Sequence, residues 1–321
     1  MTERAPRPAP WPQAPWHARI AAAAPGSKIV FSAPLHKMTT LRIGGPAECL
    51  VDVESEAELQ AALALALEEG LPWRLLGKGS NVLAPDAGLP GLTLRLVGDF
   101  QQLTAAGANA APGAEEGLVW AGAGLSNAAF VERALGLGLG GMEFLTAIPG
   151  SIGGAIAMNA GAHGQETQAF LVAARHLPPG GAITQTPRAA LEFGYRTSPL
   201  RGDRGQVVLA GAFRLEPLGP EEIRARKQHF QQWRREHQPR DYPNCGSVFK
   251  NPPDDFAARL VDQCGLKGHR IGGAQVSEKH ANFIVNRGGA KAAEVLALVA
   301  HIQTTVLQEK GISLELEMLV L

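Results

Sequence analysis

Apolar residues recur along the chain with two periods, near two and near 3.6 residues, and these periods predict a mixed α+β protein. Alternating or continuous apolar runs predict strands at about 48–53, 73–77, 91–97, 117–122, 169–175, 182–186 and 206–215. Helical spacing predicts helices at about 55–70, 126–138, 219–237, 254–264 and 290–310. In the first of these helices, leucines four residues apart predict the buried face: Leu59, Leu63 and Leu67.

The last ten residues, ISLELEMLVL, also alternate and predict a strand over 312–321. One face carries only apolar residues: Ile312, Leu314, Leu316, Met318 and Val320. The opposite face carries Glu315 and Glu317 together with two leucines. A carboxylate whose neighbours on the same face are leucines is unusual for a strand in water, so these glutamates are candidates for chemistry.

Residues 139–166 follow neither period. This stretch is apolar and crowded with glycine, which at such density costs entropy in a helix or in a strand. We therefore expect a loop, in which Gly150, Gly153, Gly154 and Gly161 let backbone N–H groups approach a ligand or adopt positive φ. The alternative interpretation is a tight packing loop in a protein core.

A second glycine-rich turn, LLGKGSNVL at 75–83, favours a ligand. Two such loops in one chain predict a diphosphate-bearing cofactor that is held by backbone amides. Residues 82–85 continue as an extended segment rather than a helix, which excludes a Rossmann fold. Lys78 lies inside the turn rather than after it, which excludes a Walker A loop.

Composition narrows the classes of partner. The length of 321 residues suggests about two domains, and the formal net charge of zero provides no overall field to attract nucleic acid or an anionic membrane. We find no apolar run of the length that a membrane span needs and no signal peptide in the proline- and alanine-rich N-terminus. Cys49, Cys245 and Cys264 have unrelated spacings, which predicts reduced thiols in a cytoplasmic protein and no metal site.

Three polar residues outside the regular elements are candidates for chemistry. Arg196 lies in FGYRTS, Ser247 follows a glycine in NCGSVFKNP, and Glu317 lies in the last segment. Each has an ordinary alternative, namely a surface arginine, a turn serine and a strand-edge carboxylate. Ser247 does not lie in a G-x-S-x-G motif, so no hydrolase is implied. The residues alone therefore indicate a two-domain α+β protein that binds a phosphate-bearing cofactor.

Taken together, the segments resemble the UDP-N-acetylenolpyruvoylglucosamine reductase (MurB) family, in its shorter, type II form. The resemblance runs from about Leu35 to the C-terminus. It rests on these motifs in this order: LRIGGPAECLV, LGKGSNVL, GMEFLTAIPGSIGGAIAMNAGAHGQE, FGYRTS, CGSVFKNP, QCGLKGHRIGGAQVSEKHANFIVN and LELE.

The resemblance implies an α+β fold in which an FAD-binding domain of the vanillyl-alcohol-oxidase type, made of two subdomains, precedes a smaller α+β substrate domain. The expected boundaries are an N-terminal tail over 1–30, mobile at its start, an FAD-binding domain over 31–218 with subdomains at about 31–97 and 98–218, a substrate domain over 219–311, and a strand over 312–321 that carries a catalytic glutamate.

Non-covalently bound FAD is the implied cofactor, NADPH is the implied co-substrate, and no metal is implied. The residues expected around the FAD diphosphate are Gly77, Lys78, Gly79, Ser80, Asn81, Ile148, Pro149, Gly150, Ser151, Gly153 and Gly154. Along the flavin we expect Asn159, Gly161 and Ala162.

The resemblance also implies a reaction. NADPH reduces FAD and leaves, and UDP-N-acetylenolpyruvoylglucosamine then takes the hydride to give UDP-N-acetylmuramate, a precursor of peptidoglycan. Arg196 would stabilise the developing negative charge. Ser247 would donate a proton, with Lys250 making its hydroxyl more acidic. Glu317 would orient the enolpyruvyl group, and its leucine neighbours would raise its pKa.

Substrate contacts are expected from Tyr195, Lys250, Asn251 and His280. We expect a cytoplasmic monomer that inserts into no membrane and binds no nucleic acid.

Two departures from the family pattern leave alternatives. The usual ending, leucine-glutamate-proline-glutamate-valine-arginine, is here LELEML, so Glu315 is the alternative to Glu317. The chain after Arg196 lacks the tyrosine-bearing loop of the longer form, which implies a more open site. Two other functions stay open: a flavin oxidase with FAD tethered to His163, and a flavin- or nucleotide-sugar-binding module without turnover.

Overall fold

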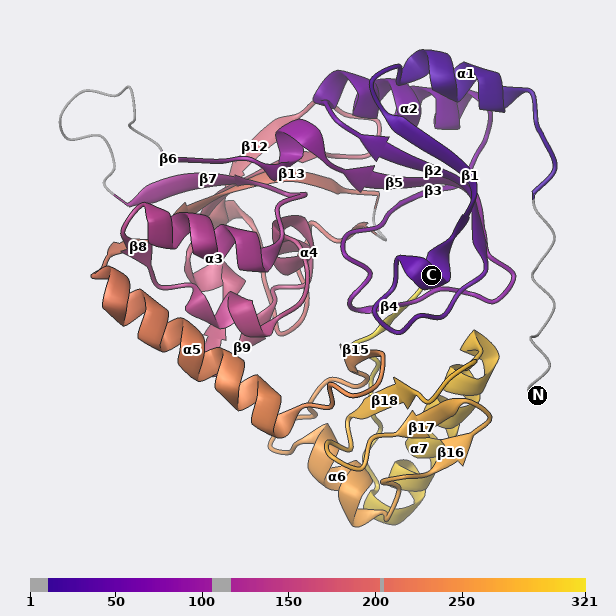
Figure 1. Cartoon of the computed structure of the whole chain (residues 1–321), viewed down its shortest axis with the longest axis vertical. Helices are drawn as coiled ribbons and strands as arrows, with labels where there is room; N and C mark the ends of the chain where they lie inside the picture. The colour runs from indigo at the N-terminus through magenta and orange to yellow at the C-terminus, as the bar shows by residue number, and fades with distance from the viewer. Residues whose placement is uncertain (1–10, 106–116, 203–204) are drawn as a thin grey trace.

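The computed structural model describes residues 11–105, 117–202 and 205–321. Within these residues the chain forms three α+β units, each built on its own sheet (Figure 1). None of the helices that the structure describes is long and apolar enough to cross a membrane.

The first unit has a sheet in the order β1–β2–β5–β3, and its strands are β1 (Lys28–Pro34), β2 (Pro46–Val53), β5 (Leu89–Leu96) and β3 (Trp73–Leu75). β1 runs antiparallel to β2, whereas β2, β5 and β3 are parallel. The crossover that parallel strands require contains helix α2 (Glu56–Glu68). As predicted, Ser55 caps this helix, since its hydroxyl accepts the Glu58 N–H at 3.3 Å.

The buried face of α2 differs from the prediction. The buried residues are Leu59, Ala62, Leu65 and Ala66. Leu67 is 82% exposed, so its assignment to the core is wrong. Residues four positions apart advance about 40° around a helix at each step, so the third leucine of the series turns away from the sheet. The small alanines at 62 and 66 take its place.

Much of the expected N-terminal tail is folded. Helix α1 (Trp16–Ala23) buries Trp16 and Ile20 in the same apolar cluster as residues of α2 and the first sheet. The Trp11 indole N–H also donates to the Pro46 carbonyl at 3.1 Å. The tail prediction is therefore wrong from Trp11 onward, because two aromatic side chains and an isoleucine anchor an alanine-rich segment. Residues 1–10, where mobility was expected, lie outside the described residues.

The second unit has an antiparallel sheet in the order β12–β11–β13–β7–β6, and its strands are β12 (Thr184–Pro187), β11 (Leu171–Leu177), β13 (Val207–Arg214), β7 (Leu118–Gly122) and β6 (Leu103–Ala105). Helices α3 (Asn127–Gly136) and α4 (Ile152–Ala157) pack on it. Two short ribbons complete the unit: β8 (Leu139–Gly140) with β14 (Glu216–Pro217), and β9 (Gly161–Ala162) with β10 (Gln165–Glu166).

Helix α5 (Pro220–His237) leads from the second unit to the third (Figure 1). The third unit has a sheet in the order β15–β18–β17–β16, and its elements are β15 (Asn244–Ser247), α6 (Ala257–Gln263), β16 (Arg270–Ile271), β17 (Ala274–Val276), β18 (Phe283–Asn286) and α7 (Ala292–Lys310). The predicted stripe of α7 is confirmed, since it buries Val295, Val299, Ile302 and Val306.

The first and third units share one core. Leu41, Ile43 and Leu83 of the first unit belong to the apolar cluster that fills the third. The Asp86 carboxylate accepts the N–H groups of Ala292 and Ala293 at 2.8 and 3.1 Å, and so caps α7 from the first unit. The two units are therefore joined by packing as well as by chain connection.

The C-terminal segment is not the single strand predicted over 312–321. Its first part pairs with the chain after β15: Lys250 N–H donates to Glu315 O at 2.8 Å, and Glu317 N–H donates to Val248 O at 2.9 Å. Its end forms β19 (Leu319–Val320), which runs parallel to β4 (Val82–Leu83) of the first unit. The prediction fails because the segment exchanges one partner for another near residue 318. The C-terminus lies beside β4 in Figure 1.

The corrected face of α2 yields a direct test with a matched control. Leu59→Ala removes a fully buried side chain and is expected to lower the free energy of unfolding by about 2–5 kcal/mol. Leu67→Ala removes the same atoms from an exposed position and is expected to change it by about 0.5 kcal/mol or less. Urea unfolding followed by circular dichroism measures both. Equal losses would contradict the burial pattern.

Candidate active site

The two glycine-rich loops line one cavity of about 1490 Å³, together with Arg196, Ser247, His280 and Glu317. Its volume exceeds the roughly 300–1,000 Å³ of a usual small-molecule pocket. The lining is contributed by all three units, because the first glycine loop, the Arg196 turn and Ser247 come from different sheets. The cavity is therefore large enough for a dinucleotide and a second ligand.

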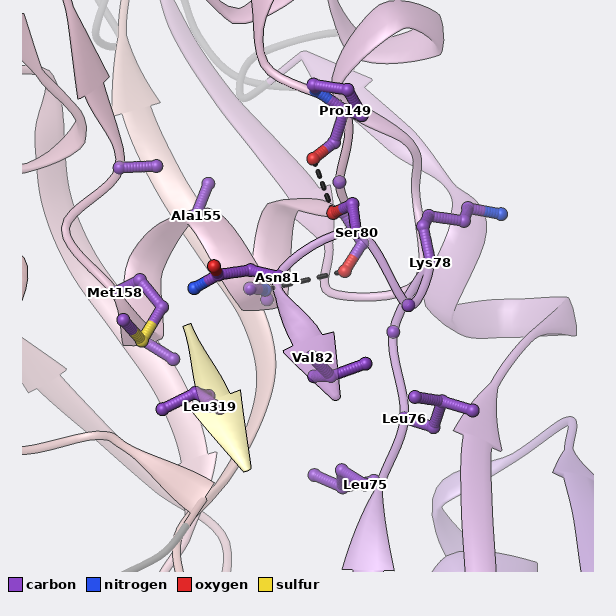
Figure 2. A pocket seen from close by; sticks show the side chains of 18 of the residues that line it. Leu75, Leu76, Lys78, Ser80, Asn81, Val82, Pro149, Ala155, Met158 and Leu319 are labelled. Atoms are coloured by element: carbon purple, nitrogen blue, oxygen red, sulfur yellow. Dashed lines mark hydrogen bonds between the residues drawn. The ribbon is translucent and has the colours of Figure 1, made fainter. Parts of the chain in front are cut away.

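The first glycine loop, residues 77–81, is fixed against its surroundings. Gly79 has φ of +63°, and a Cβ there would lie 2.1 Å from the Met38 carbonyl oxygen, so only glycine fits. The Ser80 hydroxyl donates to the Pro149 carbonyl at 2.6 Å, as Figure 2 shows. This bond joins two loops that are 69 residues apart in the chain.

The second loop contains a short helix that the sequence analysis did not predict. Ser151 caps α4, since its hydroxyl accepts the Gly154 N–H at 3.4 Å. A Cβ on Gly153 would lie 2.8 Å from the Ala123 Cβ, so this glycine serves close packing. The expectation that glycine density excludes a helix is wrong here, because a good cap and the burial of Ile152 and Ile156 stabilise the turn of helix. None of the four glycines singled out in this stretch has positive φ.

The residues expected around FAD fit a dinucleotide with one exception. All of them except Asn159 line the cavity. A Cβ on Gly154 would meet no atom closer than Ser151 Oγ at 3.6 Å, so the bare backbone faces open space there. Such exposed backbone suits the close approach of a bulky diphosphate.

Asn159 lies beneath the cavity rather than on its surface. It is fully buried, with φ of +45°. Its Nδ2 donates to Glu166 Oε2 and to the Gly194 carbonyl, both at 2.9 Å, and its Oδ1 accepts the Gln168 N–H at 3.1 Å. Because protein groups occupy both its donors and its acceptor, the structure gives Asn159 a supporting place under the Arg196 turn rather than a flavin contact.

Arg196 occupies a tight turn in an unusual conformation. The N–H of Gly194 donates to Thr197 O, the N–H of Thr197 donates to Gly194 O, and Arg196 between them has φ of +55°. In a type II turn this position requires positive φ and is usually glycine. Any other residue with positive φ there costs about 1–3 kcal/mol of stability. Two bonds hold the side chain: Nη2 donates to Gly161 O at 2.8 Å, and Nε donates to Glu317 Oε1 at 2.9 Å.

Ser247 ends β15 and faces the cavity. Among the residues that the structure describes, no hydrogen-bond partner is found for its hydroxyl. The Lys250 ammonium, which was expected to acidify this hydroxyl, instead donates to Glu315 Oε2 at 3.2 Å. His280 also lines the cavity, and burial lowers the pKa of its imidazole.

Similarity to known proteins agrees with this geometry. A family model described as "UDP-N-acetylenolpyruvoylglucosamine reductase, C-terminal domain" matches residues 238–321, and one described as "FAD binding domain" matches residues 47–186. UDP-N-acetylenolpyruvoylglucosamine reductase 2 of Symbiobacterium thermophilum is 43% identical over 285 residues, which cover 88% of this chain and 89% of that protein. The corresponding reductase of Geobacter metallireducens is 42% identical and covers 94% of this chain and 96% of its own.

The chain belongs to the UDP-N-acetylenolpyruvoylglucosamine reductase (MurB) family. The crystal structure of MurB from Thermus caldophilus matches the fold with a TM-score of 0.76 and 38% identity, over 92% of this chain and 98% of that one. The expected α+β class, with an FAD-binding domain before a reductase C-terminal domain, is confirmed.

In this MurB-family chain the two C-terminal glutamates are clearly distinguished. The Glu317 side chain is 16% exposed and pairs with Arg196, which is itself 18% exposed. The Glu315 side chain is 76% exposed and pairs with Lys250. Burial raises the pKa of Glu317 more than the adjacent Arg196 lowers it. The structure therefore brings Glu317, and not Glu315, to the arginine.

The remaining substrate candidates lie beside the cavity. Tyr195, Lys250 and Asn251 are not among its lining residues. The Tyr195 hydroxyl accepts the Asn251 N–H at 3.4 Å, and Asn251 Oδ1 accepts the N–H of Ala257, the first residue of α6. Asn251 thus has a structural role as well.

Two residues that were not predicted from the sequence, Trp233 and Gln238, line the cavity from α5 and from the residue after it. The one signal for them was a tryptophan near the end of a helix that is otherwise strongly polar. Arg74 of β3 also lines the cavity, and no sequence motif marks it.

The place given to Asn159 can be tested without activity. Asn159→Ala removes three buried hydrogen bonds, leaves the Gln168 N–H without its acceptor and puts alanine at positive φ. We therefore expect the cofactor-free protein to lose about 2–4 kcal/mol of stability. Urea unfolding of the apoprotein measures this loss. If Asn159 contacted the flavin instead, the apoprotein would keep its stability and only FAD binding would weaken.

The pH dependence of stability tests the burial of Glu317. The pKa of Glu317 in the folded protein lies above its unfolded value of about 4.3. The wild-type protein therefore loses stability as pH rises through the interval from the unfolded pKa to the folded pKa. Glu317→Gln has no such term, so its stability relative to the wild type should increase across the interval and level off above it. Urea unfolding from about pH 4 to about pH 8 follows the difference. Glu315→Gln controls for the loss of one exposed charge. A difference that shrinks with pH would show that attraction to Arg196 dominates.

Proposed function

We propose that the chain is an NADPH-dependent, FAD-containing reductase that converts UDP-N-acetylenolpyruvoylglucosamine to UDP-N-acetylmuramate for peptidoglycan synthesis. The observation that carries the proposal is the meeting of Arg196 and Glu317, 121 residues apart, in a cavity lined by both glycine loops of an FAD-binding fold. The relatives that match nearly the whole chain bear the name of this reductase.

Both glycine loops would hold FAD through the backbone of residues 77–81 and 148–154, without a covalent bond. When bound, FAD supplies a carrier that accepts hydride from NADPH and passes it to the methylene carbon of the enolpyruvyl group. That transfer builds negative charge on the adjacent carbon and on the substrate carboxylate. Arg196 would stabilise this charge as a cation whose direction is fixed by Gly161 O and Glu317.

Ser247 is the proposed proton donor. Its hydroxyl lines the cavity on the side of the third unit, where it can protonate the carbon that bears the developing charge. The resulting alkoxide takes its proton back from solvent, and the product differs from the substrate by one hydride and one proton. Glu317 would orient the guanidinium of Arg196 and the enolpyruvyl group, from a position that water hardly reaches.

Tyr195, Lys250, Asn251 and His280 are the proposed contacts of the UDP-sugar. His280 lines the cavity, whereas Tyr195, Lys250 and Asn251 lie outside its lining, and the Asn251 N–H donates to the Tyr195 hydroxyl. The proposed enzyme is a monomer. Free thiols at all three cysteines, among the residues described, support action in the cytoplasm.

Anaerobic reoxidation tests the proposed function and its residues together. The purified protein is reduced with NADPH, and UDP-N-acetylenolpyruvoylglucosamine is added while the visible flavin band is recorded. We expect rapid reoxidation without oxygen. Arg196→Ala removes one group that stabilises the transition state and should slow reoxidation by about 10²–10³-fold. Ser247→Ala removes the proton donor and should slow reoxidation by about 10²–10⁴-fold.

Glu315→Gln is the matched control and should reoxidise at the wild-type rate. A flavin that stays reduced until air enters would overturn the reductase and favour an oxidase, for which His163 would be examined for covalent flavin. Bound flavin with no consumption of NADPH would favour a binding module.

A further inference from the structure

Asn81 links the first glycine loop to the segment that carries Glu317. Its side-chain Nδ2 donates to the backbone carbonyl of Glu317 at 3.1 Å. Its own backbone carbonyl accepts the N–H of Leu319 at 3.0 Å. In Figure 2 its side chain points away from Lys78, toward Met158 and Leu319. One residue of the first glycine loop, residues 77–81, which we call the cofactor loop from here on, therefore binds the C-terminal segment on both sides of residue 318.

Glu317 is fixed at three points by three parts of the fold. Its N–H is bound by Val248 of the third unit, its carbonyl by Asn81 of the first, and its carboxylate by Arg196 of the second. Of the three residues that bind Glu317, Asn81 is the one that belongs to the first glycine loop, residues 77–81. The position of Glu317 thus depends on the conformation of the cofactor loop.

That conformation is itself well determined. Gly79 packs against Met38 and accepts the N–H of Thr40 at 2.9 Å, and Ser80 bonds Pro149 of the second loop. Asn81 directly follows these fixed residues, so its carboxamide is delivered to one place.

We propose that Asn81 is a positioning residue for the reaction, through which the cofactor loop holds Glu317 against Arg196. The proposal rests on the proposed function of that pair. It predicts that the order of the cofactor loop and the geometry of the carboxylate and guanidinium are coupled, so that loosening one loosens the other.

The two bonds of Asn81 can be separated by mutation. Asn81→Ala removes the side-chain donor and keeps the backbone carbonyl that binds Leu319, so β19 retains its pairing with β4. Asn81→Asp keeps the size of the side chain and also lacks the donor. Thr40→Val is the control: it removes a side-chain bond to the same loop, from Thr40 Oγ1 to Gly79 O at 3.3 Å, without touching the C-terminal segment.

A double-mutant cycle on the anaerobic reoxidation rate tests the role in the reaction. At saturating substrate, Asn81→Ala should slow reoxidation about tenfold, the equivalent of one lost hydrogen bond. The same change made in Glu317→Gln should alter the rate by about twofold or less, because the two residues act as one unit. All variants are assayed with FAD at saturating concentration, so that a change in FAD affinity does not enter the measured rate.

Hydrogen exchange gives a readout that does not require turnover. In Asn81→Ala the amides of the segment 316–319 should exchange about tenfold faster than in the wild type, and in Thr40→Val they should not.

Three results would overturn the proposal. The first is rate losses that are additive in the cycle, and the second is a loss confined to FAD affinity. The third is unchanged hydrogen exchange in Asn81→Ala while the wild-type protein turns over normally. A wild-type protein that binds FAD but never oxidises NADPH would overturn the function as well, whatever the exchange shows.

Discussion

The ion pair between Arg196 and Glu317 depends on the placement of the last ten residues of the chain. Both residues are in energetically unfavourable environments. Arg196 has a backbone conformation that favours glycine, and Glu317 has lost so much water that its pKa is raised beside a cation. Such a pair contributes little to stability, because desolvation offsets the attraction. Its geometry is held by neighbours on every side, which is the pattern expected where a fold keeps strain for function.

The glycines of the two loops serve the protein and a ligand at the same time. Gly79 and Gly153 let parts of the chain approach one another, at distances that a Cβ would forbid. Gly154 instead turns a bare backbone toward open space. The packing interpretation and the cofactor interpretation of a glycine-dense stretch are therefore both correct, at different residues. The packed glycines give the loop its rigidity, and the open ones give it access.

The sequence predicts best the features that depend on neighbouring residues. The cap at Ser55, the stripe of α7 and the absence of a helix after the first glycine turn follow from local spacing, and the structure confirms them. It predicts poorly the features that depend on distant partners. The C-terminal segment changes partner near residue 318. Helix α1 ends at Ala23 and packs on α2, which begins 33 residues later, at Glu56.

The site shows the same division. Family motifs single out Arg196, Ser247 and two glutamates, but alternation places Glu315 and Glu317 on one face and cannot choose between them. Burial chooses, since one carboxylate is 16% exposed and the other 76%. The motif does not predict that the Asn159 side chain lies beneath the cavity, because a motif records which residues are near a cofactor, and not which of their side chains face it. The units themselves explain why chemistry gathers here. The first unit shares apolar clusters with the second and with the third, whereas the second and third meet at Arg196 with Glu317 and at Tyr195 with Asn251. The proposed reacting groups, Arg196 and Glu317, lie where the second and third units meet.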